Sequence, residues 1–191
     1  MKTDLKKVIL STLENLIEIM KHNEGISIAI RQRLTFEKWL QIELAGRLSY
    51  HLKCEPDIKV VLEAPISSKI SKRSKSVDIS IQRSNDKLFG IELKIVATNY
   101  QVGGIENKSK GATLKVSELI VDLKKAREDG YKEYMSLAFV FPFPIQENHR
   151  NNTLDFPKYL ARLRDHGEVE LFNFNFYGHF NVAFVSLYNK K

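Results

Sequence analysis

The sequence lacks several features that would narrow its function at once. It has one cysteine, Cys54, among 191 residues, so it can form neither an intramolecular disulfide nor a cysteine metal cluster. Its five histidines do not follow the spacing of metal ligands. No apolar run approaches the ~20 residues that cross a bilayer, and the N-terminal stretch has no uncharged core like that of a signal peptide. These absences predict a soluble, cytoplasmic protein with no membrane partner.

The composition is that of a globular domain with a basic surface. Hydrophobic residues make up 43% of the chain, and no repeat or low-complexity linker divides it, so residues 1–191 are expected to form one domain. The formal net charge is +7. An excess of positive charge favours an anionic partner such as nucleic acid, although a basic surface that only contacts water is the alternative.

Hydrophobic periodicity predicts an α/β protein with a mixed central sheet flanked by helices. The predicted helices cover 4–22, with Asn23 ending the first, then 36–52 behind Thr35, 113–128, and a short segment after Asp155. The predicted strands cover 58–64, 76–82, 88–96, 134–143, 168–176 and 179–188. We expect the first three strands to form an antiparallel meander and the last two a hairpin. The helix at 113–128 is expected to connect two parallel strands, of which 134–143 is apolar enough to be buried on both faces.

The hairpin from Ser76 to Val96 carries the residues that indicate chemistry. Asp78 lies on the polar face of the first strand, and Glu92 and Lys94 share one face of the second, because side chains alternate along a strand. Such charges beside apolar faces are costly unless a metal ion or a substrate uses them. The alternative is an ordinary exposed cluster on the open face of a hairpin.

Phosphodiester hydrolysis would explain this combination of residue types. Carboxylate oxygens suit Mg²⁺ or Mn²⁺, so Asp78 and Glu92 are the predicted metal ligands, with the carbonyl of Leu93 as a third. Lys94 is predicted to orient or deprotonate the attacking water and to offset charge on the phosphate.

A carboxylate from the helix at 36–52 is expected to complete the site. Glu43 interrupts the apolar stripe of that helix, so it is predicted to face the core or a cleft, whereas Glu37 reaches solvent more easily. We therefore prefer Glu43 over Glu37 as the assisting residue. A salt bridge between Glu43 and Arg47, four residues later, is the alternative role.

The pattern resembles the PD-(D/E)xK nuclease superfamily, which has the restriction-endonuclease-like fold. Asp78 is followed, after thirteen residues, by Glu92-Leu93-Lys94, although Val77 stands where the motif has proline. The element order over about 35–143 is similar to the αβββαβ core of that fold, here with an extra N-terminal helix and a C-terminal helix plus hairpin. The resemblance implies a Mg²⁺-dependent deoxyribonuclease, an endonuclease, with DNA as its partner. Because cutting both strands of a duplex commonly requires two active sites, a homodimer is also compatible.

The candidates for nucleic-acid contact come from two predicted loops and from the start of the helix at 113–128. The loop at 67–75 is as often simply solvated, whereas the lysines just beyond Glu92-Leu93-Lys94 are better placed to contact DNA, and Gln101 either lines the cleft or only fills a loop. These candidates are Lys69, Lys72, Arg73, Lys75, Gln101, Lys108, Lys110 and Lys115.

Two other functions are compatible with the sequence. One is a catalytically inactive nuclease-like domain that binds nucleic acid or a protein partner in a defence or repair assembly. The other is a structural protein whose positive charge is incidental.

Overall fold

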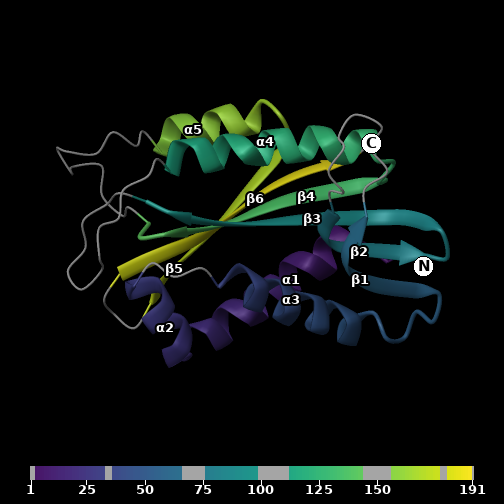
Figure 1. The fold of residues 1–191 in the computed structure, drawn as a ribbon, viewed down its shortest axis with the longest axis horizontal. Helices are drawn as coiled ribbons and strands as arrows, with labels where there is room; N and C mark the ends of the chain where they lie inside the picture. Colours follow the sequence, from purple (N-terminus) through teal and green to yellow (C-terminus); the bar gives the residue numbers. More distant parts are fainter. Residues whose placement is uncertain are drawn as a thin grey trace.

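The chain forms a six-stranded mixed sheet with helices on both faces (Figure 1). A computed structural model describes residues 3–32, 36–65, 76–98, 112–143, 156–176 and 180–190. The helices are α1 (Leu5–Met20), α2 (Glu24–Arg31), α3 (Glu37–His51), α4 (Ala112–Glu128) and α5 (Phe156–Arg164). The strands are β1 (Ile58–Pro65), β2 (Ser76–Arg83), β3 (Asp86–Ala97), β4 (Glu133–Phe141), β5 (Glu168–Phe176) and β6 (Phe180–Lys190).

The strand order across the sheet is β1-β2-β3-β4-β6-β5. The first three strands pair antiparallel. Strands β3 and β4, which α4 connects in the sequence, pair parallel, and β6 pairs antiparallel with both β4 and β5. This arrangement confirms the predicted meander, the parallel pair and the closing hairpin. Strand β4 is buried along almost its whole length, as its continuous apolar run predicted.

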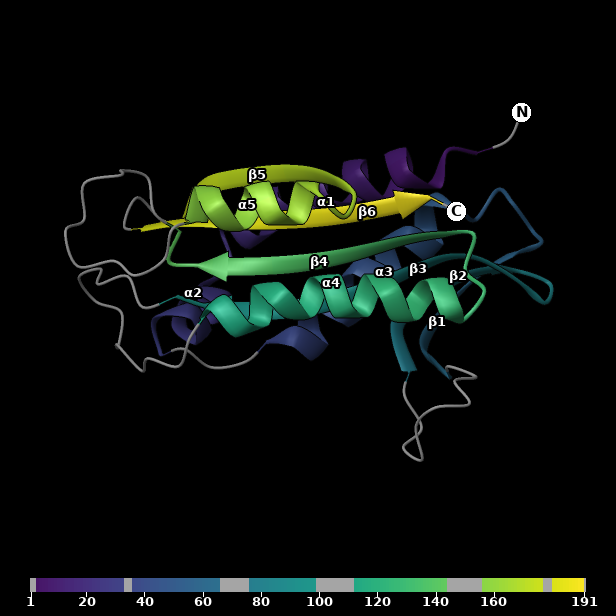
Figure 2. The ribbon, with the colours of Figure 1, turned by 90° about the horizontal axis from the view of Figure 1, so that it is seen from above.

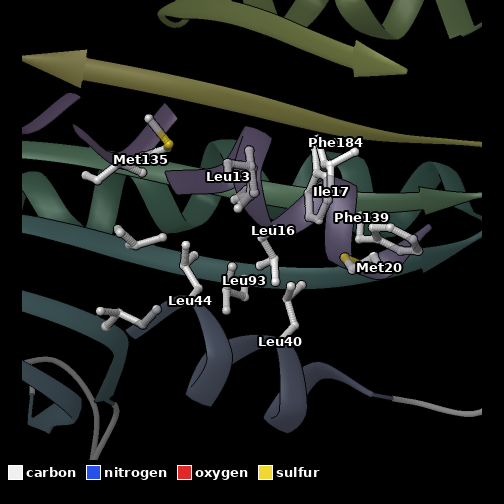
Figure 3. Close-up of a cluster of buried hydrophobic side chains, with 14 of the residues drawn as sticks. Leu13, Leu16, Ile17, Met20, Leu40, Leu44, Leu93, Met135, Phe139 and Phe184 are labelled. Carbon is white, nitrogen blue, oxygen red and sulfur yellow. The ribbon is translucent and has the colours of Figure 1, made fainter. Parts of the chain in front are cut away.

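The helices α1, α2 and α3 cover one face of the sheet, and α4 and α5 cover the other (Figure 1). On the first face, apolar side chains of α1 and α3 meet the sheet in one buried cluster (Figure 3). The cluster includes Leu13, Leu16, Ile17, Met20, Leu40, Leu44, Leu93, Met135, Phe139 and Phe184. Because the helical stripe and the alternating strand residues point to the same layer, the amphipathic pattern of each element is satisfied there.

The second face is covered by α4, which contacts β3 and β4, and by α5, which contacts β5 (Figure 2). Leu119, Ile120, Leu123 and Ala126 are buried on α4, as the sequence predicted. Gly90 of β3 lies directly under Tyr134, so that a Cβ at position 90 would come within 2.7 Å of the aromatic ring. Close packing on this face therefore requires glycine at that position.

The N-terminal helices differ from the prediction in one respect. Asn23 was expected to end the first helix, but its side chain also accepts a hydrogen bond from the backbone N–H of Ile26 and caps an additional helix, α2. α1 ends at Met20 with Lys21 as its C-cap, so Asn23 begins the second helix and does not end the first. The predicted cap Thr35 lies outside the described residues, and α3 begins after Phe36.

Candidate active site

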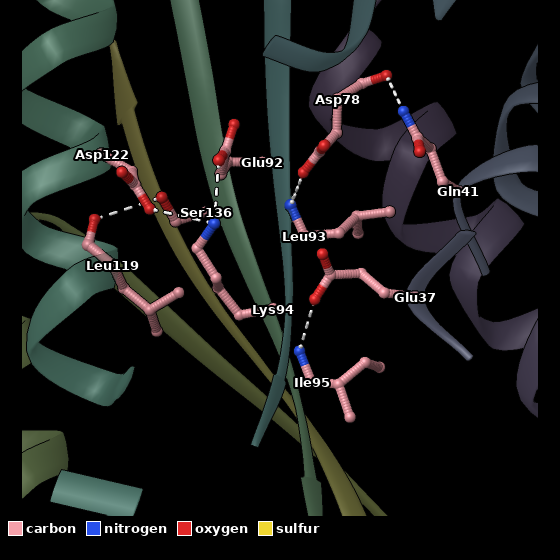
Figure 4. A network of polar contacts seen from close by, with 10 residues as sticks. All are labelled: Glu37, Gln41, Asp78, Glu92, Leu93, Lys94, Ile95, Leu119, Asp122 and Ser136. Carbon is pink, nitrogen blue, oxygen red and sulfur yellow. Dashed lines mark hydrogen bonds and ion pairs between the residues drawn. The ribbon is translucent and has the colours of Figure 1, made fainter. Parts of the chain in front are cut away.

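The candidate site lies where β2 and β3 separate. The two strands pair from Arg83 opposite Asp86 to Ile79 opposite Ile91, where their pairing ends. Strand β2 remains paired with β1 as far as Ser76. Beyond that point, carboxylates accept hydrogen bonds from the backbone of β3 (Figure 4). Asp78 Oδ2 accepts from the Leu93 N–H at 2.7 Å, and Glu37 Oε2 accepts from the Ile95 N–H at 3.1 Å. Two carboxylates thus take the place of a neighbouring strand.

Helix α3 holds the separated part of β2 in position. Gln41 is buried, and its side-chain amide donates a 2.6 Å hydrogen bond to the carbonyl of Asp78. The amide oxygen of Gln41 in turn accepts a hydrogen bond from Lys38. Asp78 is therefore fixed both through its backbone and through its carboxylate.

The carbonyl of Leu93 faces the same gap as Asp78. In a strand, the N–H and C=O of one residue point to the same side, and the N–H of Leu93 points to the Asp78 carboxylate. The three oxygen ligands that the sequence predicted are therefore contributed by adjacent positions of the two diverging strands.

Glu92 and Lys94 extend from β3 toward α4 (Figure 4). Lys94 Nζ lies 2.9 Å from Glu92 Oε1 and 3.5 Å from Asp122 Oδ2 of α4. The side chains of Glu92 and Lys94 are only 15% and 21% exposed. This burial excludes the alternative in which they are ordinary exposed residues on an open sheet face.

Burial raises the pKa values of both carboxyl groups. The pKa of Glu92 is raised to about 7, mainly by burial and then by the negative charge of Asp78. Burial also raises the pKa of Asp78, although the hydrogen bond from Leu93 opposes this shift. Burial lowers the pKa of Lys94, but the negative charges of Glu92 and Asp122 outweigh it and keep its pKa above the ordinary value. The site thus combines a protonated lysine with carboxylates that are costly to ionise.

The oxygen atoms at this site fit a hard divalent cation. Asp78 and Glu92 repel each other in a desolvated space, which a cation would relieve, and the Leu93 carbonyl faces the same gap. Among the residues that the structure describes, no group of three or more His, Cys, Asp or Glu side chains is arranged to hold a metal ion. Two carboxylates and a carbonyl nevertheless suit Mg²⁺, because this ion usually keeps several water molecules.

The structure brings Glu37, and not the predicted Glu43, to the gap between the strands. Glu43 Oε1 accepts two hydrogen bonds from Arg47, from Nη2 at 2.5 Å and from Nε at 2.9 Å, and Glu43 lines a surface hollow between α3 and α1. Gln41 and Glu43 are two residues apart, about 200° around a helix, so they point in nearly opposite directions. The prediction that Glu43 assists the site is wrong, because the face of α3 that packs against β2 includes Gln41 and not Glu43. The alternative, a salt bridge between Glu43 and Arg47, is confirmed.

Asp122 is a residue of the cluster that the sequence analysis missed. It lies three residues after Leu119 and one before Leu123, on the inward face of α4, and it is 8% exposed. An acidic residue within the apolar stripe of the helix predicted at 113–128 was the available signal. The same test, applied to the helix at 36–52, led to Glu43, so the signal alone does not identify a site residue.

Most of the predicted phosphate contacts lie outside the described residues. This holds for Lys69, Lys72, Arg73, Lys75, Gln101, Lys108 and Lys110. Lys115 belongs to α4, in a turn of which only the backbone is described. The segment 66–75 connects β1 to β2 and therefore joins the sheet just before Asp78. The connection between β3 and α4 follows the strand that carries Glu92 and Lys94.

Within the described residues, no helix is both long and apolar enough to cross a membrane. No family model matches the sequence, and neither a curated protein nor a solved structure matches it.

Proposed function

We propose that the protein is a divalent-metal-dependent nuclease that hydrolyses phosphodiester bonds in DNA. The observation that carries this proposal is the meeting of Asp78, Glu92 and Lys94 in a buried cluster where β2 leaves β3. Buried ionisable groups with strongly shifted pKa values concentrate at functional sites. The agreement of their spacing and element order with the PD-(D/E)xK pattern supports the same reaction class.

The residues have distinct roles in this proposal. Asp78, Glu92 and the Leu93 carbonyl would hold the cation, which when bound polarises the phosphate and lowers the pKa of its water. Lys94 remains protonated beside them and offsets negative charge that develops on the phosphate. Its raised pKa favours orientation of the attacking water over removal of a proton from it. Glu37 fixes the backbone of β3 next to these groups.

DNA as substrate is supported by the excess of positive charge. The net charge of +7 favours a polyanion, and contacts to phosphates require no base recognition. We therefore expect the protein to bind DNA with an affinity that falls steeply as the salt concentration rises.

A second function is favoured by one observation. Lys94 is already paired with both Glu92 and Asp122, so the charges of this cluster are partly neutralised without a cation. A nuclease-like domain that binds nucleic acid without cutting it would have such a site. In that case, binding to DNA persists and cleavage is absent with every metal.

Cleavage of plasmid and single-stranded DNA with Mg²⁺ or Mn²⁺ separates the two functions. We expect Asp78→Asn and Lys94→Met to reduce the rate by at least about a hundredfold, the usual cost of losing a group that stabilises charge in the transition state. Glu43→Gln is the matched control for Asp78→Asn, because Glu43 is also an acidic residue but contacts Arg47 and points away from the cluster. Activity that persists in both Asp78→Asn and Lys94→Met would overturn the proposed nuclease site.

A further inference from the structure

We propose that Asp122 is a positioning residue, which holds the Lys94 ammonium group in place for the reaction. This inference rests on the proposed nuclease function and assigns a role to a residue outside the Asp-Glu-Lys pattern. Asp122 Oδ2 lies 3.5 Å from Lys94 Nζ, and Glu92 Oε1 contacts the same nitrogen at 2.9 Å. The two carboxylates come from different elements, β3 and α4, and hold the ammonium group between them (Figure 4).

Lys94 needs a partner besides Glu92. Glu92 is a candidate metal ligand, and its charge attracts the ammonium group less when a cation shares it. The lysine side chain has four rotatable methylene groups, so without a second fixed charge it would sample other positions. Asp122 supplies that charge from α4 and is not needed as a ligand. With it, three carboxylates face one ammonium group, a surplus of negative charge that suits a divalent cation.

Asp122 is itself held in place by the packing of α4. Leu119 and Leu123, on the same face of the helix, are buried against the sheet. The buried hydroxyl of Ser136 in β4 donates a 3.1 Å hydrogen bond to the carbonyl of Leu119, one turn before Asp122 (Figure 4). This hydrogen bond ties α4 to β4 at the turn that carries Asp122, which gives its carboxylate the rigidity that positioning requires.

A double-mutant cycle tests the role. Asp122→Asn should reduce Mg²⁺-dependent cleavage about 10- to 100-fold, the usual cost of losing a partner of a functional group, and Asp122→Glu should restore part of it. In the Lys94→Met background, Asp122→Asn should cause no further loss, because the lysine through which Asp122 acts is gone. Glu118→Gln is the control, since Glu118 is an exposed acidic residue of the same helix.

Urea denaturation provides a readout that needs no activity. It is measured on the wild type, Asp122→Asn, Lys94→Met and the double variant. The two single substitutions should not combine independently, and we expect a coupling of about tenfold in the unfolding equilibrium constant between Lys94 and Asp122. Independent effects on stability, or an Asp122→Asn variant that cuts as fast as the wild type, would overturn the positioning role alone. A wild type that cuts no DNA with either metal would overturn the nuclease function, and the positioning role with it.

Discussion

Replacing Glu92 by glutamine should make the protein more stable at neutral and alkaline pH. The pKa of this carboxyl group is raised from 4.5 to about 7 by burial and by the neighbouring Asp78. One pKa unit corresponds to about 1.4 kcal/mol, so the ionised side chain costs the folded state roughly 3 kcal/mol relative to the protonated one. Its side chain is only 15% exposed, so solvent screening does not remove this cost. Glutamine has nearly the same shape and carries no charge.

The direction of the pH dependence follows from proton binding. Between pH 4.5 and about 7, Glu92 binds a proton in the folded state more readily than in the unfolded state. Stability therefore falls as pH rises through this window and becomes level above it, as far as this residue determines it. Below the window, the carboxyl group is protonated in both states and contributes no difference.

Urea denaturation from about pH 4 to about pH 8 measures the effect. The free energy of unfolding of Glu92→Gln should be close to that of the wild type at the acidic end, and it should exceed it by up to roughly 3 kcal/mol at the alkaline end. Glu43→Gln is the control for the substitution itself, because Glu43 contacts Arg47 and lies outside the cluster. A difference between Glu92→Gln and wild type that stays constant with pH would refute the assignment of a buried, repelled carboxylate.

Three further substitutions test the packing and helix capping of the fold. Gly90→Ala should lower the free energy of unfolding by about 1–3 kcal/mol, because its Cβ would press on the ring of Tyr134; an unchanged melting temperature would contradict the close approach. Phe139→Ala should cost about 3–5 kcal/mol in urea denaturation, since this ring is fully buried; a loss below about 1 kcal/mol would show that the core packs differently. Asn23→Ala should cost about 1 kcal/mol and reduce the helical circular dichroism signal, because its side chain caps α2 at Ile26; Asn23→Asp should retain most of both.

Much of the fold could be predicted because its signals are local. The apolar run of β4 indicated a strand buried on both faces, and the helix before it required a parallel crossover. The alternation along β3 placed Glu92 and Lys94 on one face, and the structure confirms that they are in contact. Each of these inferences depends on residues within one element or on the connection between two.

The contribution of α3 could not be predicted because it depends on distant partners. The stripe that includes Glu43 looked inward from the sequence, yet the buried face is set by what the helix packs against. Gln41 is buried since it meets the carbonyl of Asp78, which lies 37 positions away in the chain. Glu37, at the first turn of the helix, is next to β3 for the same reason, and its hydrogen bond spans 58 positions. Such pairings follow from the tertiary structure and leave no periodic pattern in either segment.

The separation of β2 from β3 agrees with the proposed function. A continuous ladder would satisfy the backbone of Leu93 and Ile95 with neutral groups, whereas here carboxylates of Asp78 and Glu37 accept those bonds. Replacing a buried charged cluster by apolar residues is often neutral or stabilising, so structural need alone does not favour this arrangement. The raised pKa of Glu92 shows that the cluster carries an electrostatic cost in the free protein. A bound cation or phosphate would convert that cost into binding energy, and this exchange connects the open strand pair to the proposed reaction.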